Sequence, residues 1–127
     1  MTLDEAVDLL TVAAAFDQRT VGEGDAMAWH SVVGDLPFAD AKQAVLIYYA
    51  EHRERIMPAD VRQRVTEARK QRILDAGIPA PPPELIDDPP AYRAALRAAA
   101  VALGDGRDPE PAMQAIARQS RRELEAS

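Results

Sequence analysis

The sequence predicts an all-α protein with a compact four-helix N-terminal domain, a proline-rich spacer and a two-helix C-terminal tail. Hydrophobic residues make up 47% of the 127 residues, which is enough for a folded core, but aromatic residues supply only 5%. Much of the hydrophobic share is alanine, which favours helices and buries little area per residue. No run of six residues alternates apolar and polar side chains as an amphipathic strand would. Six prolines between positions 78 and 90 mark the one clear boundary.

The first helix is predicted from Leu3 to about residue 17. Thr2 and Glu5 have the spacing of a capping box, in which each side chain bonds the backbone amide of the other residue. Apolar residues then recur at intervals of three and four, which indicates one buried stripe. The stripe is formed by Leu3, Val7, Leu10 and Ala14, and it is widened by Leu9, Val12 and Phe16. A loop with two glycines follows over residues 19–24.

Two more helices are predicted over about 25–33 and 38–52. Gly34 and Pro37 separate them, because glycine accepts the left-handed position after a helix and proline cannot continue one. Both segments carry apolar residues at helical spacing, and we expect these to be buried. They are Trp29 and Val33 in the first segment, and Phe38, Ala41, Val45 and Tyr48 in the second.

A fourth helix is predicted from Pro58 to about Ala76, with Gly77 ending it. Proline suits the first helical position, and Asp60 lies favourably at the positive end of the helix dipole. This segment differs in charge from the rest of the chain, whose net charge is −6. Residues 58–77 carry five basic and three acidic side chains, a net of +2. The helix is therefore locally basic in an acidic protein.

The basic side chains of this helix are the candidates for binding a protein partner or DNA. They are Arg62, Arg64, Arg69, Lys70 and Arg72. Arginine can hold a carboxylate or a phosphate through two hydrogen bonds. The alternative is an ordinary solvated face, with cations placed favourably near the end of the helix. The negative net charge argues against broad nucleic-acid binding, so we expect at most a weak DNA contact.

Residues 78–90 are predicted to form an extended, semi-stiff spacer because of their prolines. Beyond it, helices are predicted from about Ala91 to Leu103 and from about Pro109 to Glu125. Their apolar area is too small for stable folding alone, so we expect them to be loosely attached or to order on a partner. The predicted domains are therefore 1–77, 78–90 and 91–127.

No set of reactive residues can be assembled from the sequence, and we expect no enzymatic activity, no cofactor and no metal site. The chain has no cysteine, which excludes disulfides and thiolate chemistry. Lys42 and Lys70 are both followed by glutamine, so the phosphate-binding loop that requires Gly-Lys-Ser/Thr is absent. His30 and His52 lie on different predicted helices, without a second histidine at metal-binding spacing.

The N-terminal residues predict a cytoplasmic protein with no membrane partner. Acidic residues stand where a signal peptide would carry lysine or arginine. The longest apolar stretches are much shorter than a membrane-spanning helix.

The segment Trp29–Tyr49, followed by Ile56–Arg62, resembles the small bacteriophage helicase-loader family. These are loader-and-inhibitor proteins that act on phage replicative helicases, and the similarity is greatest to those of actinobacterial phages and prophages. It covers about residues 3–75 and depends mainly on core and capping positions. The residues that carry it are Trp29, Ala41, Val45, Tyr49, Pro58, Ala59, Asp60 and Val61.

The resemblance implies a DNA-replication accessory protein that delivers a hexameric DnaB-type replicative helicase to an initiator-bound origin in a bacterial host cell. One module would hold the origin-binding initiator or its DNA complex, and the other would hold the helicase, with the spacer raising the effective concentration of the second contact. The candidates for helicase contact lie in the tail and are Met113, Ile116, Arg118, Arg121 and Leu124. Two alternatives stay open: a small helical DNA-binding transcriptional regulator, and a phage structural or host-takeover protein.

Overall fold

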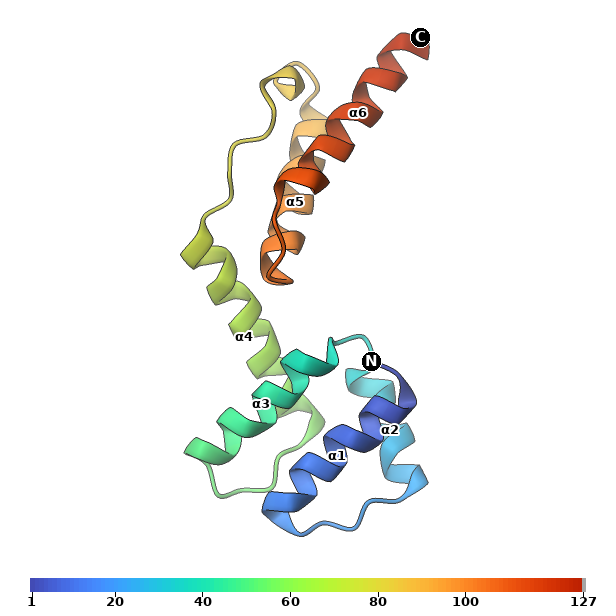
Figure 1. Ribbon diagram of the computed structural model, residues 1–127, viewed down its shortest axis with the longest axis vertical. Helices are drawn as coiled ribbons and strands as arrows, with labels where there is room; N and C mark the ends of the chain where they lie inside the picture. The colour runs from blue at the N-terminus through green and yellow to red at the C-terminus, as the bar shows by residue number, and fades with distance from the viewer. Residues whose placement is uncertain (127) are drawn as a thin grey trace. The chain divides into compact units, whose positions relative to one another are not determined.

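The computed structural model describes residues 1–126, which form six α-helices and one short 3-10 helix without any strand (Figure 1). The predicted all-α class is therefore confirmed. The helices are α1 (Leu3–Asp17), α2 (Glu23–Val33), α3 (Phe38–Glu51), α4 (Pro58–Ala76), η1 (Pro83–Leu85), α5 (Pro89–Gly104) and α6 (Glu110–Ala126). Between Met1 and Ala126, no helix combines the length and the apolar character that crossing a bilayer requires.

The chain divides into two compact units, the first formed by residues 1–67 and the second beginning at residue 68. The division falls inside α4, so the two halves of this helix belong to different units. Val61 and Val65 are buried in the core of the first unit. Arg69 and Arg72, one and two turns later, bond to the end of α5 in the second unit. This division differs from the predicted domain limits at 77 and 90.

The core of the first unit lies between α1, α2, α3 and the first half of α4. The predicted capping box is present, since the Thr2 amide donates to Glu5 at 2.8 Å and the Glu5 amide donates to Thr2 at 3.1 Å. Trp29 is buried, as its position beside Val33 predicts. Fourteen buried residues form this core: Leu9, Leu10, Ala13, Ala26, Trp29, Val33, Leu36, Ala41, Ala44, Val45, Tyr48, Ile56, Val61 and Val65.

The buried stripe of α1 differs from the predicted one. Leu3, Val7 and Phe16 are exposed, Leu3 by 46%, whereas Leu9 and Leu10 are buried as predicted. The fully buried residues follow the same spacing in a different phase: Ala6, Leu9, Leu10 and Ala13. Helical periodicity allowed both phases, and contacts with α2 and α3 favour the one that places two small alanines against neighbouring helices.

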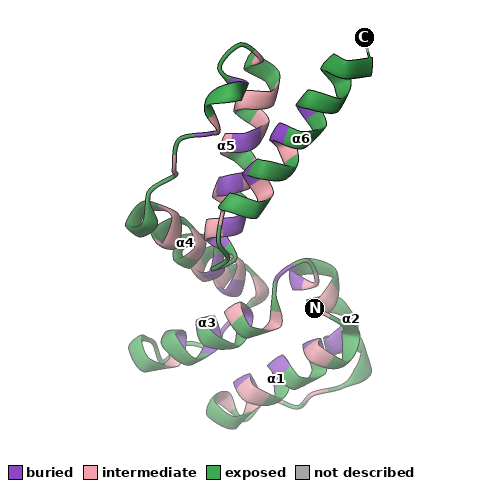
Figure 2. Ribbon diagram, turned by 45° about the horizontal axis from the view of Figure 1, so that its top comes forward, coloured by how far each residue is buried: buried purple, intermediate pink, exposed green. Residues whose placement is uncertain are grey.

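The second unit has a smaller core of its own, between η1, α5 and α6. Figure 2 shows buried residues on α5 and α6 where the two helices face each other. Asp88 caps α5 by accepting from the Ala91 amide, and its other oxygen accepts from the Ser120 hydroxyl at 2.7 Å. The two tail helices are therefore packed against each other. The core residues are Leu85, Ala95, Ala99, Met113 and Ala117.

The proline-rich segment is not an extended spacer over its whole length. Pro81 is buried, and Leu85 in η1 is 1% exposed within the core of the second unit. η1 contacts both α5 and α6. The sequence predicts an extended segment because six prolines surround a single Leu-Ile pair. In the structure, burial of Leu85 stabilises the turn η1.

Candidate binding surfaces

Arg62 is bound within the first unit by the connection between α2 and α3. Its Nη1 donates to Asp35 Oδ1 at 2.6 Å and to the Val32 carbonyl at 2.8 Å, and its Nη2 donates to Asp35 Oδ2 at 3.2 Å. The hydrogen bond from Arg62 lowers the pKa of Asp35. An acidic or phosphate-bearing partner would therefore have to compete with a two-point contact that already exists.

Arg64 is also held inside the first unit. Its Nη2 donates to Glu51 Oε2 at 3.2 Å, and its guanidinium lies 5.4 Å from the centre of the Tyr48 ring. At this distance the ring attracts the cation. Both contacts direct the side chain along the end of α3 rather than outward from α4.

The other three basic candidates of α4 lie in the second unit. Arg69 Nη1 lies 2.5 Å from Asp105 Oδ1, and Arg72 Nη1 donates to the Gly104 carbonyl at 2.7 Å. Hydrogen bonds from Arg107 and Arg69 lower the pKa of Asp105. Arg72 thus bonds a carbonyl of the last turn of α5, where a cation is favourable. Lys70 is exposed.

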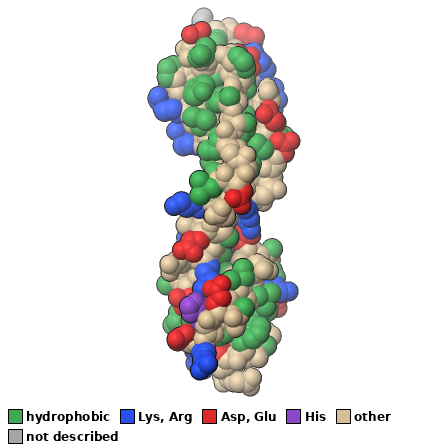
Figure 3. Space-filling model, turned by 90° about the vertical axis from the view of Figure 1, so that its left-hand side faces the viewer, with side chains coloured by type: hydrophobic (Ala, Val, Ile, Leu, Met, Phe, Trp, Pro, Cys, Tyr) green, Lys and Arg blue, Asp and Glu red, His purple; other side chains and the backbone are tan. Residues whose placement is uncertain are grey.

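The five basic candidates are divided between the two units. Two belong to the first unit and three to the second, and the arginines contact groups of their own unit. On the face that Figure 3 shows, acidic side chains occur among the basic ones within each unit. A face of mixed charge lacks the concentrated positive charge by which proteins neutralise phosphates.

The tail candidates divide into core and surface residues. Met113 is 0% exposed, and Ile116 is half-buried against the core of the second unit. In the folded unit these two residues pack against α5, so their assignment as partner contacts is corrected to a core role. Arg121 Nη1 donates to both Glu84 oxygens, at 2.8 and 2.7 Å, while Arg118 and Leu124 are exposed.

The C-terminal turns of α6 form the most exposed part of this helix. Residues 121–126 are all exposed, and Leu124 has an exposed fraction of 71%. In Figure 1 these turns extend beyond the start of α5. Leu124 lies seven residues after the buried Ala117, so it continues the apolar stripe of α6 past the part that α5 covers.

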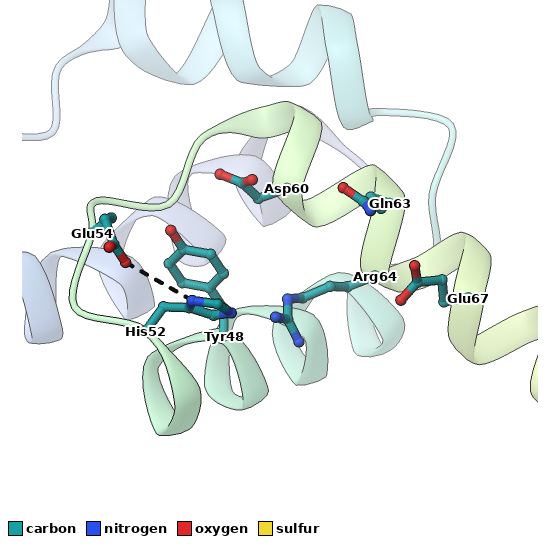
Figure 4. Close-up of a pocket in the computed structure, with 7 residues that line it drawn as sticks. All are labelled: Tyr48, His52, Glu54, Asp60, Gln63, Arg64 and Glu67. Carbon is teal, nitrogen blue, oxygen red and sulfur yellow. Dashed lines mark ion pairs between the residues drawn. The ribbon is translucent and has the colours of Figure 1, made fainter.

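An open cleft of about 380 Å³ lies in the first unit between the end of α3, the loop over residues 52–57 and the first half of α4 (Figure 4). Tyr48 and His52 come from the end of α3, and Glu54 comes from the loop. The His52 ring stacks on the Tyr48 ring with 4.8 Å between the centroids, and its Nδ1 lies 3.9 Å from Glu54. The remaining lining residues lie on α4: Asp60, Gln63, Arg64 and Glu67.

The cleft was not predicted from the sequence. The helical spacing predicts that Tyr48 is buried, which is correct, but it does not indicate a cleft beside this residue. The spacing of the lining residues gives no signal, because the cleft forms only when the loop folds back beside α4. Among the described residues, no group of three or more His, Asp or Glu side chains is placed to hold a metal ion.

A buried network fixes the loop that borders the cleft. Arg19 Nη2 donates to the Ile56 carbonyl at 2.8 Å, and the Ile56 amide donates to the Tyr49 hydroxyl at 2.9 Å. Asp17 joins these two side chains, since it accepts from Arg19 Nε at 2.9 Å and from the Tyr49 hydroxyl. Both hydrogen-bonding groups of the Ile56 backbone are thereby satisfied, which holds the loop in one position.

The same network determines the pKa of Asp17. Burial alone would raise the pKa of Asp17, but the hydrogen bonds from Arg19 and Tyr49 outweigh that effect and lower it to about 2. Arg19 also lies 5.2 Å from the centre of the Trp29 ring. The geometry is that of a structural ion pair whose charges are compensated locally.

Comparison of the chain with models of protein families, with curated proteins and with solved structures gives no match. Function must therefore be inferred from the residues and contacts of this chain.

Proposed function

We propose that this protein is a bacteriophage DNA-replication accessory protein that binds a hexameric DnaB-type replicative helicase and delivers it to an initiator-bound origin. The resemblance of residues 3–75 to the phage helicase-loader family supports this role. The observation that carries it is the presence of two compact helical units, each with its own buried core. Such a chain offers two separate outer surfaces, so it can bind two bodies, the second at high effective concentration.

The helicase contact is assigned to the second unit, at the C-terminal turns of α6. Arg118 and Leu124 are exposed there, and Leu124 continues the apolar stripe of the helix. An amphipathic helix commonly docks by placing such a stripe in an apolar groove of its partner. The first unit is assigned to the initiator side.

A co-purification experiment with the cognate helicase tests this assignment. Leu124→Asp should weaken capture by the full-length protein by about tenfold or more, because burying a leucine contributes about 1.5–3 kcal/mol. Leu74→Asp is the matched control, since Leu74 is also an exposed helical leucine of the second unit, with an exposed fraction of 65%. Equal capture by wild type and by both variants would contradict the assignment to the end of α6.

A further inference from the structure

Tyr48 lines the cleft in the first unit. Tyr48 is only 7% exposed, and its ring is fixed by contacts with His52 and Arg64. Figure 4 shows the hydroxyl pointing toward the space between Glu54 and Asp60. Among the described residues this hydroxyl makes no hydrogen bond, so its oxygen is available to a polar group that enters the open cleft.

The charge around this hydroxyl is negative. Three carboxylates line the cleft, those of Glu54, Asp60 and Glu67, against a single guanidinium. That guanidinium, on Arg64, is already bonded to Glu51, which is not among the lining residues. Burial, followed by the charges of Asp60 and Glu54, raises the pKa of Tyr48. The hydroxyl therefore stays protonated at neutral pH and keeps an oxygen that can accept a hydrogen bond.

We propose that the cleft binds the side chain of an arginine from a partner protein. A guanidinium carries five N–H donors in one plane, so it can bond to the Tyr48 hydroxyl oxygen and to carboxylates on more than one side of it. The ammonium group of lysine is compact and more strongly hydrated, and we expect it to bind less well. The ligand is thus a basic protein segment, and the inference does not depend on the identity of the helicase or the initiator.

Titration of the full-length, ¹⁵N-labelled protein with short blocked peptides tests the proposal. The probes are acetyl-Gly-Arg-Gly-amide, the same peptide with lysine, and the same peptide with citrulline, which keeps the shape of arginine without its charge. The arginine peptide should shift the amide resonances of the lining residues in a saturable way. The lysine peptide should bind more weakly, and the citrulline peptide should bind at least about tenfold more weakly because the charge is lost. Equal binding of arginine and citrulline would overturn the proposal.

Two variants locate the binding to the cleft. Tyr48→Phe removes only the hydroxyl, and Glu67→Gln removes one carboxylate, and each should weaken the arginine peptide about three- to tenfold. Glu110→Gln is the control, since it makes the same charge change at an exposed position of α6. Asp60 is left unchanged because it accepts from the Met57 amide at the start of α4. Wild-type affinity for the arginine peptide in both Tyr48→Phe and Glu67→Gln would overturn the assignment to the cleft. Glu67 is exposed, so Glu67→Gln tests the assignment even if Tyr48→Phe lowers the stability of the protein.

Discussion

Asp17 illustrates, at the scale of single residues, how this protein keeps a carboxylate away from water. Its side chain is 8% exposed, as is that of Arg19, and it accepts hydrogen bonds from Arg19 and Tyr49. Removing one partner of such a pair leaves the other buried without compensation. The network also holds the Ile56 backbone, so the loop beside the cleft depends on the same residues.

The substitution Asp17→Asn should lower the free energy of unfolding at pH 7 by about 2 kcal/mol, because a pKa lowered from 3.8 to about 2 corresponds to roughly that amount. The pKa is lower in the folded state, so this stabilisation is complete above about pH 4 and disappears as the pH falls toward 2. Urea unfolding of both proteins at several pH values measures the difference. A stability difference that stays constant from pH 6 to pH 2 would contradict the role of the charge.

Ser120 makes a single-residue link between α6 and the start of α5. Its buried hydroxyl donates to Asp88 at 2.7 Å. Ser120→Ala should destabilise the protein by about 1–2 kcal/mol, since the hydrogen bond is lost in a partly buried site. Ser31→Ala is the control, because Ser31 is exposed and bonds only to Ala28 of its own helix. Thermal unfolding followed by circular dichroism compares the two variants, and equal midpoints would argue against this link.

At the scale of secondary-structure elements, local sequence signals predict where most of the helices begin and end. The capping box at Thr2 and Glu5 and the proline at position 58 predict helix starts that the structure contains. These signals work because they satisfy or remove backbone donors within one turn. The phase of the buried stripe on α1 could not be predicted, since Leu3 and Val7 are as apolar as the residues that are buried instead. Contacts with other helices decide between the two phases.

The turn η1 was missed because its stabilising residue is isolated in the sequence. Leu85 is surrounded by prolines and acids, and it is buried only because α5 and α6 lie beside it. Leu85→Ala should therefore destabilise the second unit by about 2–5 kcal/mol, while Ile86→Ala, at an exposed neighbour, should have little effect. Hydrogen exchange of α5 and α6 amides would report the change. Equal protection in the two variants would mean that η1 is not part of this core.

At the scale of the whole molecule, the sequence predicted an all-helical chain with two parts but placed the boundary at the prolines. The structure divides inside α4 because Val61 and Val65 pack in the core of the first unit, whereas Arg69 contacts Asp105 in the second. Neither this division nor the Tyr48 cleft follows from local pattern. Both depend on contacts between residues far apart in the sequence, such as Tyr49 with Asp17 and Arg69 with Asp105.

The fragment of residues 1–77 should fold by itself, because every residue of the first core lies before position 66. We expect a helical circular dichroism spectrum and a single cooperative thermal transition. Gradual loss of signal without a transition would show that the first unit needs the rest of the chain.

Co-purification with the cognate replicative helicase tests the central claim most directly, using the full-length protein and the folded fragment of residues 1–77. The account predicts that the full-length protein retains the helicase and that the fragment does not, because the exposed turns of α6 are missing from it. Equal retention of the helicase by the fragment would contradict the account.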